Sequence, residues 1–345
     1  MILAHERLRS LMEALFAAAG CGVSESACVA RSLVEANLVG HDSHGVIRAP
    51  TYLEWLRAGK VRANQSPEVV LETEAFAVID GQLGFGQVMG EAAVKLGVAK
   101  TSRHGMAAVA LRNSGHLGRI GEWPELAAKA GMVSIHFVNT SGGGILVAPQ
   151  GGTDRRLSAN PIAAGVPVEG GPPILVDIST CTIAEGKIRV AFNKHEKVPE
   201  GCILDGEGRP TTDPAAFYGP PPGAILPLGG HKGYSLSILT DILAGALTGG
   251  GCSRFGVDHV ANNMLSILFD PAFFREDGGF SDEVRRFIAH VKSARPSTPD
   301  GVILVPGEPE AQTRVQRLRD GIAIDETTWG QIMAAAETLG VPVEV

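Results

Sequence analysis

Residues 41–52 bring together side chains that could bind a small acid and move a proton. These twelve residues hold two imidazoles, the Ser43 hydroxyl, a carboxylate, a guanidinium and a phenol. On a helix, His44, Arg48 and Tyr52 would share one face, because residues four apart lie above one another. Arg can hold a carboxylate through two parallel hydrogen bonds, and His can transfer a proton near neutral pH. The alternative is a polar surface turn, but the convergence of so many groups favours a site.

Pro50 limits how this segment can fold. Because proline kinks a helix interior, we expect a helix that begins just before Pro50 and holds it in the first turn. His44 then lies on the turn that enters this helix, after an apolar-striped helix over residues 27–39. Arg48 and Tyr52 remain on one face of the second helix.

Three further segments are predicted to approach an anionic ligand. Residues 113–121 follow a predicted strand and open a helix, where free N–H groups favour an anion such as pyrophosphate. Lys232 is surrounded by glycines at a helix start, where its charge opposes the helix dipole and calls for an anion nearby. Residues 306–308 form a turn into a helix and give a weaker signal. For residues 113–121 the alternative is an ordinary glycine-rich connection.

Asp177 stands near the carboxyl end of an apolar strand over residues 174–178. Ligands of α/β proteins bind outside these strand ends. Asp177 could therefore orient His44 and stabilise its protonated form, as carboxylates do in His-dependent enzymes. The alternative is a capping role for the next helix, which Ser179 or Thr180 could also fill.

Several common motifs are missing from the chain. The glycines of residues 84–90 have the wrong spacing for a dinucleotide fingerprint, and no acidic residue follows at the expected distance. There is no Walker A motif, no His-Glu-x-x-His and no Gly-x-Ser-x-Gly. The five cysteines lie far apart without a Cys-x-x-Cys pair, so we expect neither a metal site nor a disulfide framework. We also expect the protein to reside in a reducing cytoplasm.

The composition indicates a folded globular protein. The chain has 345 residues, 44% of them hydrophobic and 19% charged, and a net charge of −7. The acidic balance argues against nucleic acid as the main partner. The longest apolar region, residues 234–247, is too short and too polar to span a membrane and is predicted to be a buried helix.

The pattern of elements predicts an α/β fold with a helical part. Residues 4–60 have helical periodicity, and strands alternate with helices from residue 69 to residue 138. Strands are also expected at residues 174–178 and 265–269, and helices at residues 281–292, 308–319 and 326–339. The C-terminal helices could pack against the N-terminal ones. We therefore expect a mainly helical domain from residues 1–68 and 281–345 and an α/β domain from residues 69–280.

The chain resembles the type 2 malate/L-lactate dehydrogenase family of NAD(P)-dependent oxidoreductases, and within it the bacterial hydroxycarboxylate dehydrogenases. The resemblance covers essentially the whole chain. The matching motifs are residues 41–45 with Arg48, Pro50 and Tyr52; Asn113 and Ser114 with His116 and Gly118; Asn160 and Pro161; Asp177 with Ser179; Gly186 and Lys187; and residues 231–234.

This resemblance implies a non-Rossmann fold with a mixed sheet, a homodimer, and hydride transfer between NAD or NADP and a 2-oxo acid. His44 matches the family's proton donor, and Ser43, Arg48, Tyr52 and His116 match the substrate side. The implied cofactor contacts are His116, Leu117, Gly118, Asn160, Asp177, Ser179, Thr180, His231, Lys232, Gly307 and Glu308. Some members, including ureidoglycolate dehydrogenase, use a lysine where this chain has residues 140–144 without one. That difference favours His44 as the acid/base.

The expected reaction is the interconversion of a small 2-oxo acid and its 2-hydroxy acid. Arg48 would hold the carboxylate, His44 would donate the proton, and Asp177 would hold the imidazole. Alternatives within the same class are a cyclic imino-acid reductase and a ureidoglycolate-type dehydrogenase. A cofactor-free lyase or isomerase and a metabolite-binding protein are alternatives from other classes. The choice between NAD and NADP stays open, because no motif orients Arg119, Arg155 or Arg156 toward a 2′-phosphate.

Overall fold

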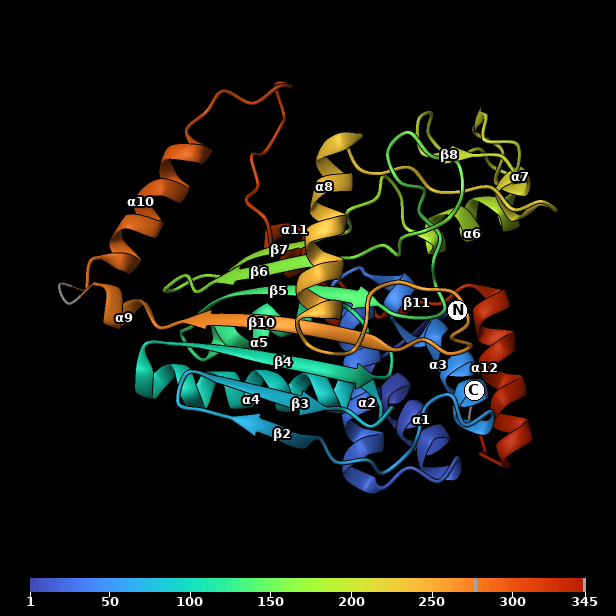
Figure 1. The fold of residues 1–345 in the computed structure, drawn as a ribbon, viewed down its shortest axis with the longest axis horizontal. Helices are drawn as coiled ribbons and strands as arrows, with labels where there is room; N and C mark the ends of the chain where they lie inside the picture. The colour runs from blue at the N-terminus through green and yellow to red at the C-terminus, as the bar shows by residue number, and fades with distance from the viewer. Residues whose placement is uncertain (276–277, 344–345) are drawn as a thin grey trace.

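A seven-stranded sheet forms the centre of the protein in a computed structural model that describes residues 1–275 and 278–343 (Figure 1). The strand order is β2-β3-β4-β10-β5-β6-β7. β3 and β4 pair in parallel, and the other neighbours pair antiparallel. The predicted α/β class with a mixed, non-Rossmann sheet is confirmed. The strands are β2 (Glu68–Glu72), β3 (Phe76–Asp80), β4 (Met106–Ser114), β5 (Val133–Thr140), β6 (Ile162–Val166), β7 (Ile174–Ile178) and β10 (Asn262–Phe269).

Helices cover both faces of this sheet. α4 (Gly86–His104), which makes the crossover from β3 to β4, and α5 (Glu122–Lys129) pack on one face. Met89, Trp123 and Leu268 are buried in the core between them and the strands. α8 (His231–Asp241) and the π-helical turn η3 (Ile242–Ala246) lie across the other face, beside β5 (Figure 1).

The prediction that residues 234–247 form a buried helix is wrong for one side of that helix. Leu236, Leu239, Ile242 and Leu247 are 37–64% exposed. The apolar composition was correct evidence for a helix. Composition alone could not show whether the exposed apolar side of this helix packs against the core of the same chain.

A second core joins the two ends of the chain. It contains residues of α1 (His5–Ala18), α2 (Val23–Leu38), α3 (Ala49–Arg57) and α12 (Glu326–Leu339), and the short pair of β1 (Ile2–Leu3) with β11 (Ile322–Ala323) closes it. Phe16, Leu33 and Ile332 are fully buried there. On this basis we propose one helical domain from both chain ends, to which α11 (Glu308–Asp320) is joined through α2.

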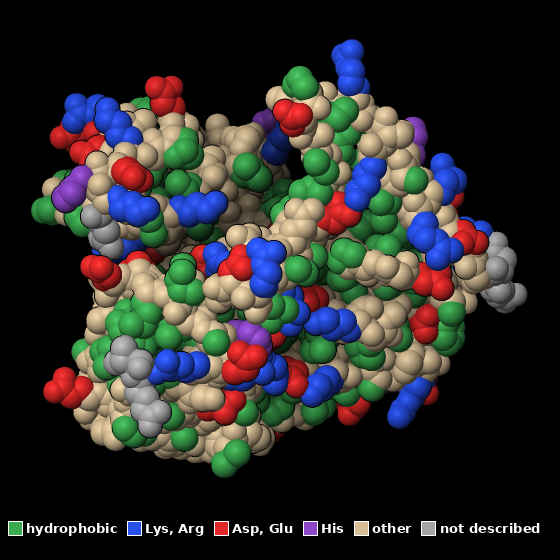
Figure 2. Space-filling model, turned by 180° about the vertical axis from the view of Figure 1, so that it is seen from behind, with side chains coloured by type: hydrophobic (Ala, Val, Ile, Leu, Met, Phe, Trp, Pro, Cys, Tyr) green, Lys and Arg blue, Asp and Glu red, His purple; other side chains and the backbone are tan. Residues whose placement is uncertain are grey.

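Two further parts flank the sheet. A lobe whose helices and short strands lie between β7 and α8 has its own core around Ile188, Phe217 and Ile225. An arm after β10 carries two helices, and the second has no buried residue. Figure 2 shows the surface hollowed between lobe and arm, with positive and negative side chains interspersed. The lobe contains α6 (Glu185–Lys194), β8 (Ile203–Leu204), β9 (Pro210–Thr211) and α7 (Pro214–Tyr218); the arm contains α9 (Pro271–Phe274) and α10 (Phe280–Lys292).

Candidate active site

The segment with the predicted chemistry forms two short 3₁₀ turns that lead into α3. These are η1 (Asp42–His44) and η2 (Val46–Arg48), and Pro50 lies in the first turn of α3 as predicted. The Ser43 hydroxyl lies 3.0 Å from Nδ1 of His44. Nε of Arg48 donates to the carbonyl oxygen of Ser43 at 2.7 Å. The turn therefore brings the hydroxyl, the imidazole and the guanidinium together.

Two residues that sequence analysis missed hold this turn in place. Asn37 is 2% exposed; its Nδ2 donates to Asp42 at 2.6 Å, and its Oδ1 accepts from the N–H of Val46 at 2.8 Å. Arg317 of α11 donates to both carboxylate oxygens of Asp42, at 2.5 and 3.0 Å. A Cβ at Gly45 would lie 2.2 Å from Oδ1 of Asn37, so only glycine fits beside this amide.

His116 reaches the same place from the loop after β4. Its ring stacks on His44, with centroids 5.8 Å apart and planes 11° apart. Nδ1 of His116 lies 2.6 Å from the Tyr52 hydroxyl and accepts from the N–H of Gly118 at 3.2 Å. Tyr52, His116 and Gln87 also line a small recess of about 10 Å³, together with Trp55, Val61, Phe85 and Gly86. The structure thus joins His44, Arg48, Tyr52 and His116 as predicted.

Both imidazoles are neutral in this arrangement. Burial lowers the pKa of His44 from 6.5 to about 3, and the charges of Arg48, His41 and Arg119 act in the same direction. Burial also lowers the pKa of His116 well below 6.5, with contributions from Arg48 and His44. The site therefore presents two uncharged rings beside one fixed cation, an arrangement that favours binding of an anion.

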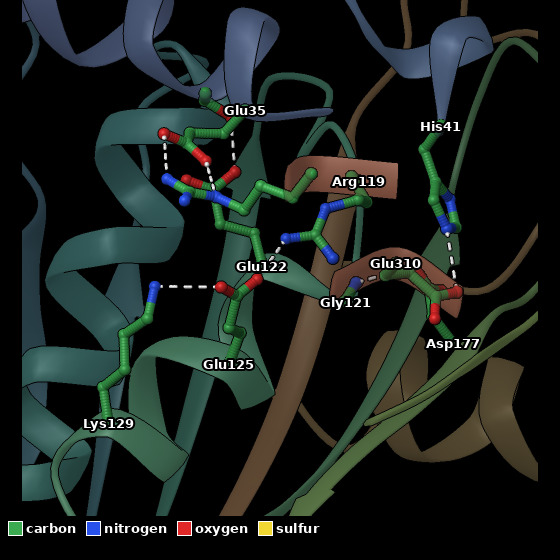
Figure 3. Close-up of polar contacts among 11 residues, drawn as sticks. Glu35, His41, Arg119, Gly121, Glu122, Glu125, Lys129, Asp177 and Glu310 are labelled. Carbon is green, nitrogen blue, oxygen red and sulfur yellow. Dashed lines mark hydrogen bonds and ion pairs between the residues drawn. The ribbon is translucent and has the colours of Figure 1, made fainter. Parts of the chain in front are cut away.

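The structure does not give Asp177 the predicted contact with His44. Its Oδ2 accepts from the N–H of Gly121 at 2.8 Å, at the N-terminus of α5 (Figure 3). No hydrogen bond joins Asp177 to His44 in the described part of the chain. The physical reason is that the first N–H groups of a helix lack partners within it and attract a carboxylate. Asp177 caps the preceding helix, α5, rather than the following one.

Two of the predicted cofactor segments lie together at the N-terminus of α8. The Thr180 carbonyl accepts from the N–H of Leu228, and a Cβ at Gly233 would lie 2.5 Å from the same oxygen. Ser179 therefore lies next to the turn that carries His231 and Lys232. Gly229 and Gly230 adopt φ of 58° and 63°, which let this turn bend sharply. His231 and Lys232 are exposed there.

The other predicted cofactor residues have internal partners. Asn160 is fully buried, and its Nδ2 donates to Ser237 and Asp241 of α8. Leu117 is fully buried. Gly307, with φ of 97°, packs on the backbone of β7, where a Cβ would lie 2.5 Å from the Pro173 carbonyl. Glu308 forms an ion pair with Lys292 and accepts from the N–H of Val305.

α11 and α6 also contact the turn of residues 41–48. His41 lies 3.5 Å from Glu310 of α11, and Figure 3 shows this pair near Asp177 and Arg119. A Cβ at Gly186 of α6 would lie 3.0 Å from the Cβ of Ser43. Within residues 1–275 and 278–343 there is no cluster of metal-binding side chains and no helix suited to crossing a bilayer.

Comparison with known proteins places the chain in a family. A model of the family "Malate/L-lactate dehydrogenase" matches residues 3–333. Hydroxycarboxylate dehydrogenase B of Escherichia coli is 41% identical, over 98% of this chain and 94% of that protein. Two solved structures are similar along nearly the whole chain. They are the sulfolactate dehydrogenase of Methanocaldococcus jannaschii (TM-score 0.89, 34% identity, 99% of this chain and 98% of that one) and the Δ1-piperideine-2-carboxylate reductase of Pseudomonas syringae pvar. tomato (0.85, 30%, 97% and 100%). The chain belongs to the malate/L-lactate dehydrogenase family.

Proposed function

We propose that this protein interconverts a small 2-oxo acid and its 2-hydroxy acid with NAD or NADP. The observation that carries the proposal is the pairing of a fixed cation, Arg48, with two stacked neutral imidazoles, His44 and His116. Membership of the malate/L-lactate dehydrogenase family supports the same reaction class.

Arg48 binds the substrate carboxylate. Its Nε is held by the Ser43 carbonyl, whereas its terminal nitrogens have no hydrogen bond to other described residues. These two nitrogens can therefore take both oxygens of a carboxylate in parallel. Ser43 and Tyr52 complete the substrate side, with the Ser43 hydroxyl oriented by Nδ1 of His44.

His44 moves the proton. When bound, a reduced nicotinamide would supply the hydride that C2 of the 2-oxo acid accepts. As the C2–O double bond becomes a single bond, His44 donates a proton to the oxygen, and the 2-hydroxy acid forms. In the reverse direction the neutral imidazole takes the hydroxyl proton, and its lowered pKa keeps it in that basic form. The Arg48–carboxylate pair offsets part of the positive field that disfavours protonated His44.

The α8 N-terminus is the proposed place for the cofactor phosphates. It combines the positive end of the dipole of an eleven-residue helix, two glycines that allow close approach, and the exposed Lys232. This donor set fits a pyrophosphate. Ser179, Thr180 and His231 lie beside it. The other proposed cofactor contacts are Leu117, Gly118, Asn160, Asp177, Gly307 and Glu308.

A cyclic imino-acid reductase is the second candidate. The similarity to the Pseudomonas syringae reductase favours it. A C=N carbon can accept the hydride in the same site, with the carboxylate still on Arg48.

We further propose a homodimer in a reducing cytoplasm. The apolar side chains that α8 and α10 expose, such as Leu239 and Phe287, support a protein partner there. All five cysteines are free thiols, which supports a reducing compartment.

A substrate panel tests the proposal. Purified protein is assayed with NADH and NADPH against pyruvate, oxaloacetate, sulfopyruvate, phenylpyruvate, a cyclic imine and, in reverse, ureidoglycolate. Turnover of 2-oxo acids supports the first candidate, and turnover of the imine alone supports the second. Absence of reduced-nicotinamide binding in a fluorescence titration would instead support a cofactor-free lyase or a binding protein.

A further inference from the structure

We propose that Gln87 is a positioning residue that, through Tyr52, fixes His116 with a bare Nδ1 and a hydrogen on Nε2. In this form His116 presents a hydrogen-bond donor, not a proton acceptor, to an oxygen of the bound substrate. The inference rests on the proposed function for the identity of that substrate. The geometry of the three side chains stands independently of it.

The direction of the hydrogen bonds follows from Gly118. Its backbone N–H can only donate, and it donates to Nδ1 of His116 at 3.2 Å. Nδ1 therefore carries a lone pair, and a neutral imidazole must then hold its hydrogen on Nε2. The Tyr52 oxygen lies 2.6 Å from the same Nδ1, so its O–H donates to the lone pair that the Gly118 N–H also shares.

Gln87 completes this chain of donors. Because the Tyr52 hydrogen is committed to His116, its oxygen can only accept, and Nε2 of Gln87 donates to it at 3.3 Å. Turning the amide over would place Oε1 against the lone pairs of Tyr52. The bonds therefore run in one direction, from Gln87 to Tyr52 to His116.

Gln87 is buried beside the loop that carries His116, and its amide is oriented by its contact with Tyr52. Gln87 is 1% exposed in the first turn of α4, and its Oε1 is buried without a hydrogen-bond partner in the described structure. A buried carbonyl oxygen without a partner is unfavourable, so Oε1 does not stabilise this orientation of the amide. The hydrogen bond from Nε2 to Tyr52 therefore sets the orientation. A Cβ at Gly86 would lie 2.2 Å from the His116 carbonyl, which shows how tightly the start of α4 packs on this loop.

Nε2 of His116 is left for a ligand. The hydrogen bonds of this ring to other described residues are all made at Nδ1. The ring stacks on His44, so both imidazoles border the space beside Arg48. A donor at Nε2 suits an oxygen of the 2-oxo acid, while His44 supplies the proton.

The test compares Gln87→Met and Gln87→Glu with Thr101→Val. Thr101 is a matched control: it lies on the same helix, is fully buried, and has a hydroxyl without a partner. The first readout is a long-range ¹H–¹⁵N spectrum of the histidine rings, with His116 assigned through His116→Gln. The second is the pH profile of kcat/KM for the 2-oxo acid that the enzyme reduces fastest.

We expect the unaltered protein to show Nε2 of His116 protonated and Nδ1 bare. Gln87→Glu and Gln87→Met should change these nitrogen shifts and lower kcat/KM by about tenfold, the order of one hydrogen bond, with cofactor binding unchanged. Thr101→Val should change neither. A protonated Nδ1 in the unaltered protein, or Gln87 variants that match Thr101→Val, would overturn the proposal.

Two further experiments keep the test decisive. If the Gln87 variants do not fold, Tyr52→Phe removes the same O–H donor and is read by the same spectrum. If no 2-oxo acid is reduced, the proposed function fails, but the nitrogen shifts still decide the hydrogen-bond chain.

Discussion

The imidazole rings of His44 and His116 lie stacked, 5.8 Å between centroids, although 72 positions separate them in the chain. Burial lowers the pKa of both rings, and the charge of Arg48 lowers it further. Burial and this cation together favour the neutral form of both rings in the free protein. Binding of a carboxylate to Arg48 then favours protonation of His44.

This relationship predicts pH-dependent binding of a substrate analogue. Oxamate, an analogue of pyruvate, should bind more tightly as the pH falls from 7 toward 5. The sign follows because the pKa of His44 is about 3 in the free protein and higher in the complex, so binding takes up a proton. Calorimetry in two buffers of different ionisation enthalpy measures this proton uptake. His44→Asn should abolish most of it, and an uptake that persists unchanged in that variant would contradict the assignment.

Replacement of Arg48 by Lys should weaken substrate binding more than turnover. A lysine offers one point charge in place of two parallel donors, and it loses the bond from Nε to the Ser43 carbonyl. We expect KM for 2-oxo acids to rise roughly 10- to 100-fold, with a smaller change in kcat. Steady-state kinetics measure both constants. Arg57→Lys, at an exposed position on the following helix α3, is the control, and an unchanged KM would place the carboxylate elsewhere.

Replacement of Arg317 by Lys should loosen the turn that carries His44. The bidentate contact with Asp42 is lost, although Asn37 still holds the turn from inside. We expect kcat to fall several-fold and stability to drop by at most about 1 kcal/mol, since the pair is partly exposed. Urea denaturation and kinetics check the two effects. Arg314→Lys on the same helix, whose partner is Glu35, should leave kcat unchanged; equal effects at both positions would refute a specific role.

Replacement of Phe287 by Asp should weaken self-association. Phe287 is 55% exposed on α10, and if the proposed dimer uses this surface, a charge there would be buried at a cost. Sedimentation velocity should show a dimer for the unaltered protein and a shift toward monomer for the variant. Val23→Asp, at a position 89% exposed on α2, is the control. A monomeric unaltered protein would contradict the homodimer.

Local patterns in the sequence predicted the elements and the reactive turn, but not the contacts between distant segments. Pro50 located the start of α3, and the predicted alternation of strands with helices over residues 69–138 includes β4 and β5. The sheet order was not predictable, because β10 enters between β4 and β5 from more than a hundred residues away. The hydrophobic pattern of a strand indicates that the strand is buried, but it does not indicate which strands pair with it.

The candidate site shows the same division. His44 and Arg48 could be proposed from the sequence because several ionisable and polar side chains lie within one short segment. Asn37 and Arg317 carry no such signal, since an Asn or Arg on a helix is ordinary until the fold brings it to Asp42. Asp177 was assigned to the wrong partner, because the sequence cannot show that a helix N-terminus competes for its carboxylate.

The kinetics of His44→Asn with the best 2-oxo acid test the central claim most directly. We predict a fall in kcat of roughly 10²- to 10⁴-fold, the usual contribution of a positioned proton donor. Fluorescence titration of the same variant should show unchanged binding of NADH or NADPH. Turnover equal to that of the unaltered protein would contradict a role for His44 as the proton donor.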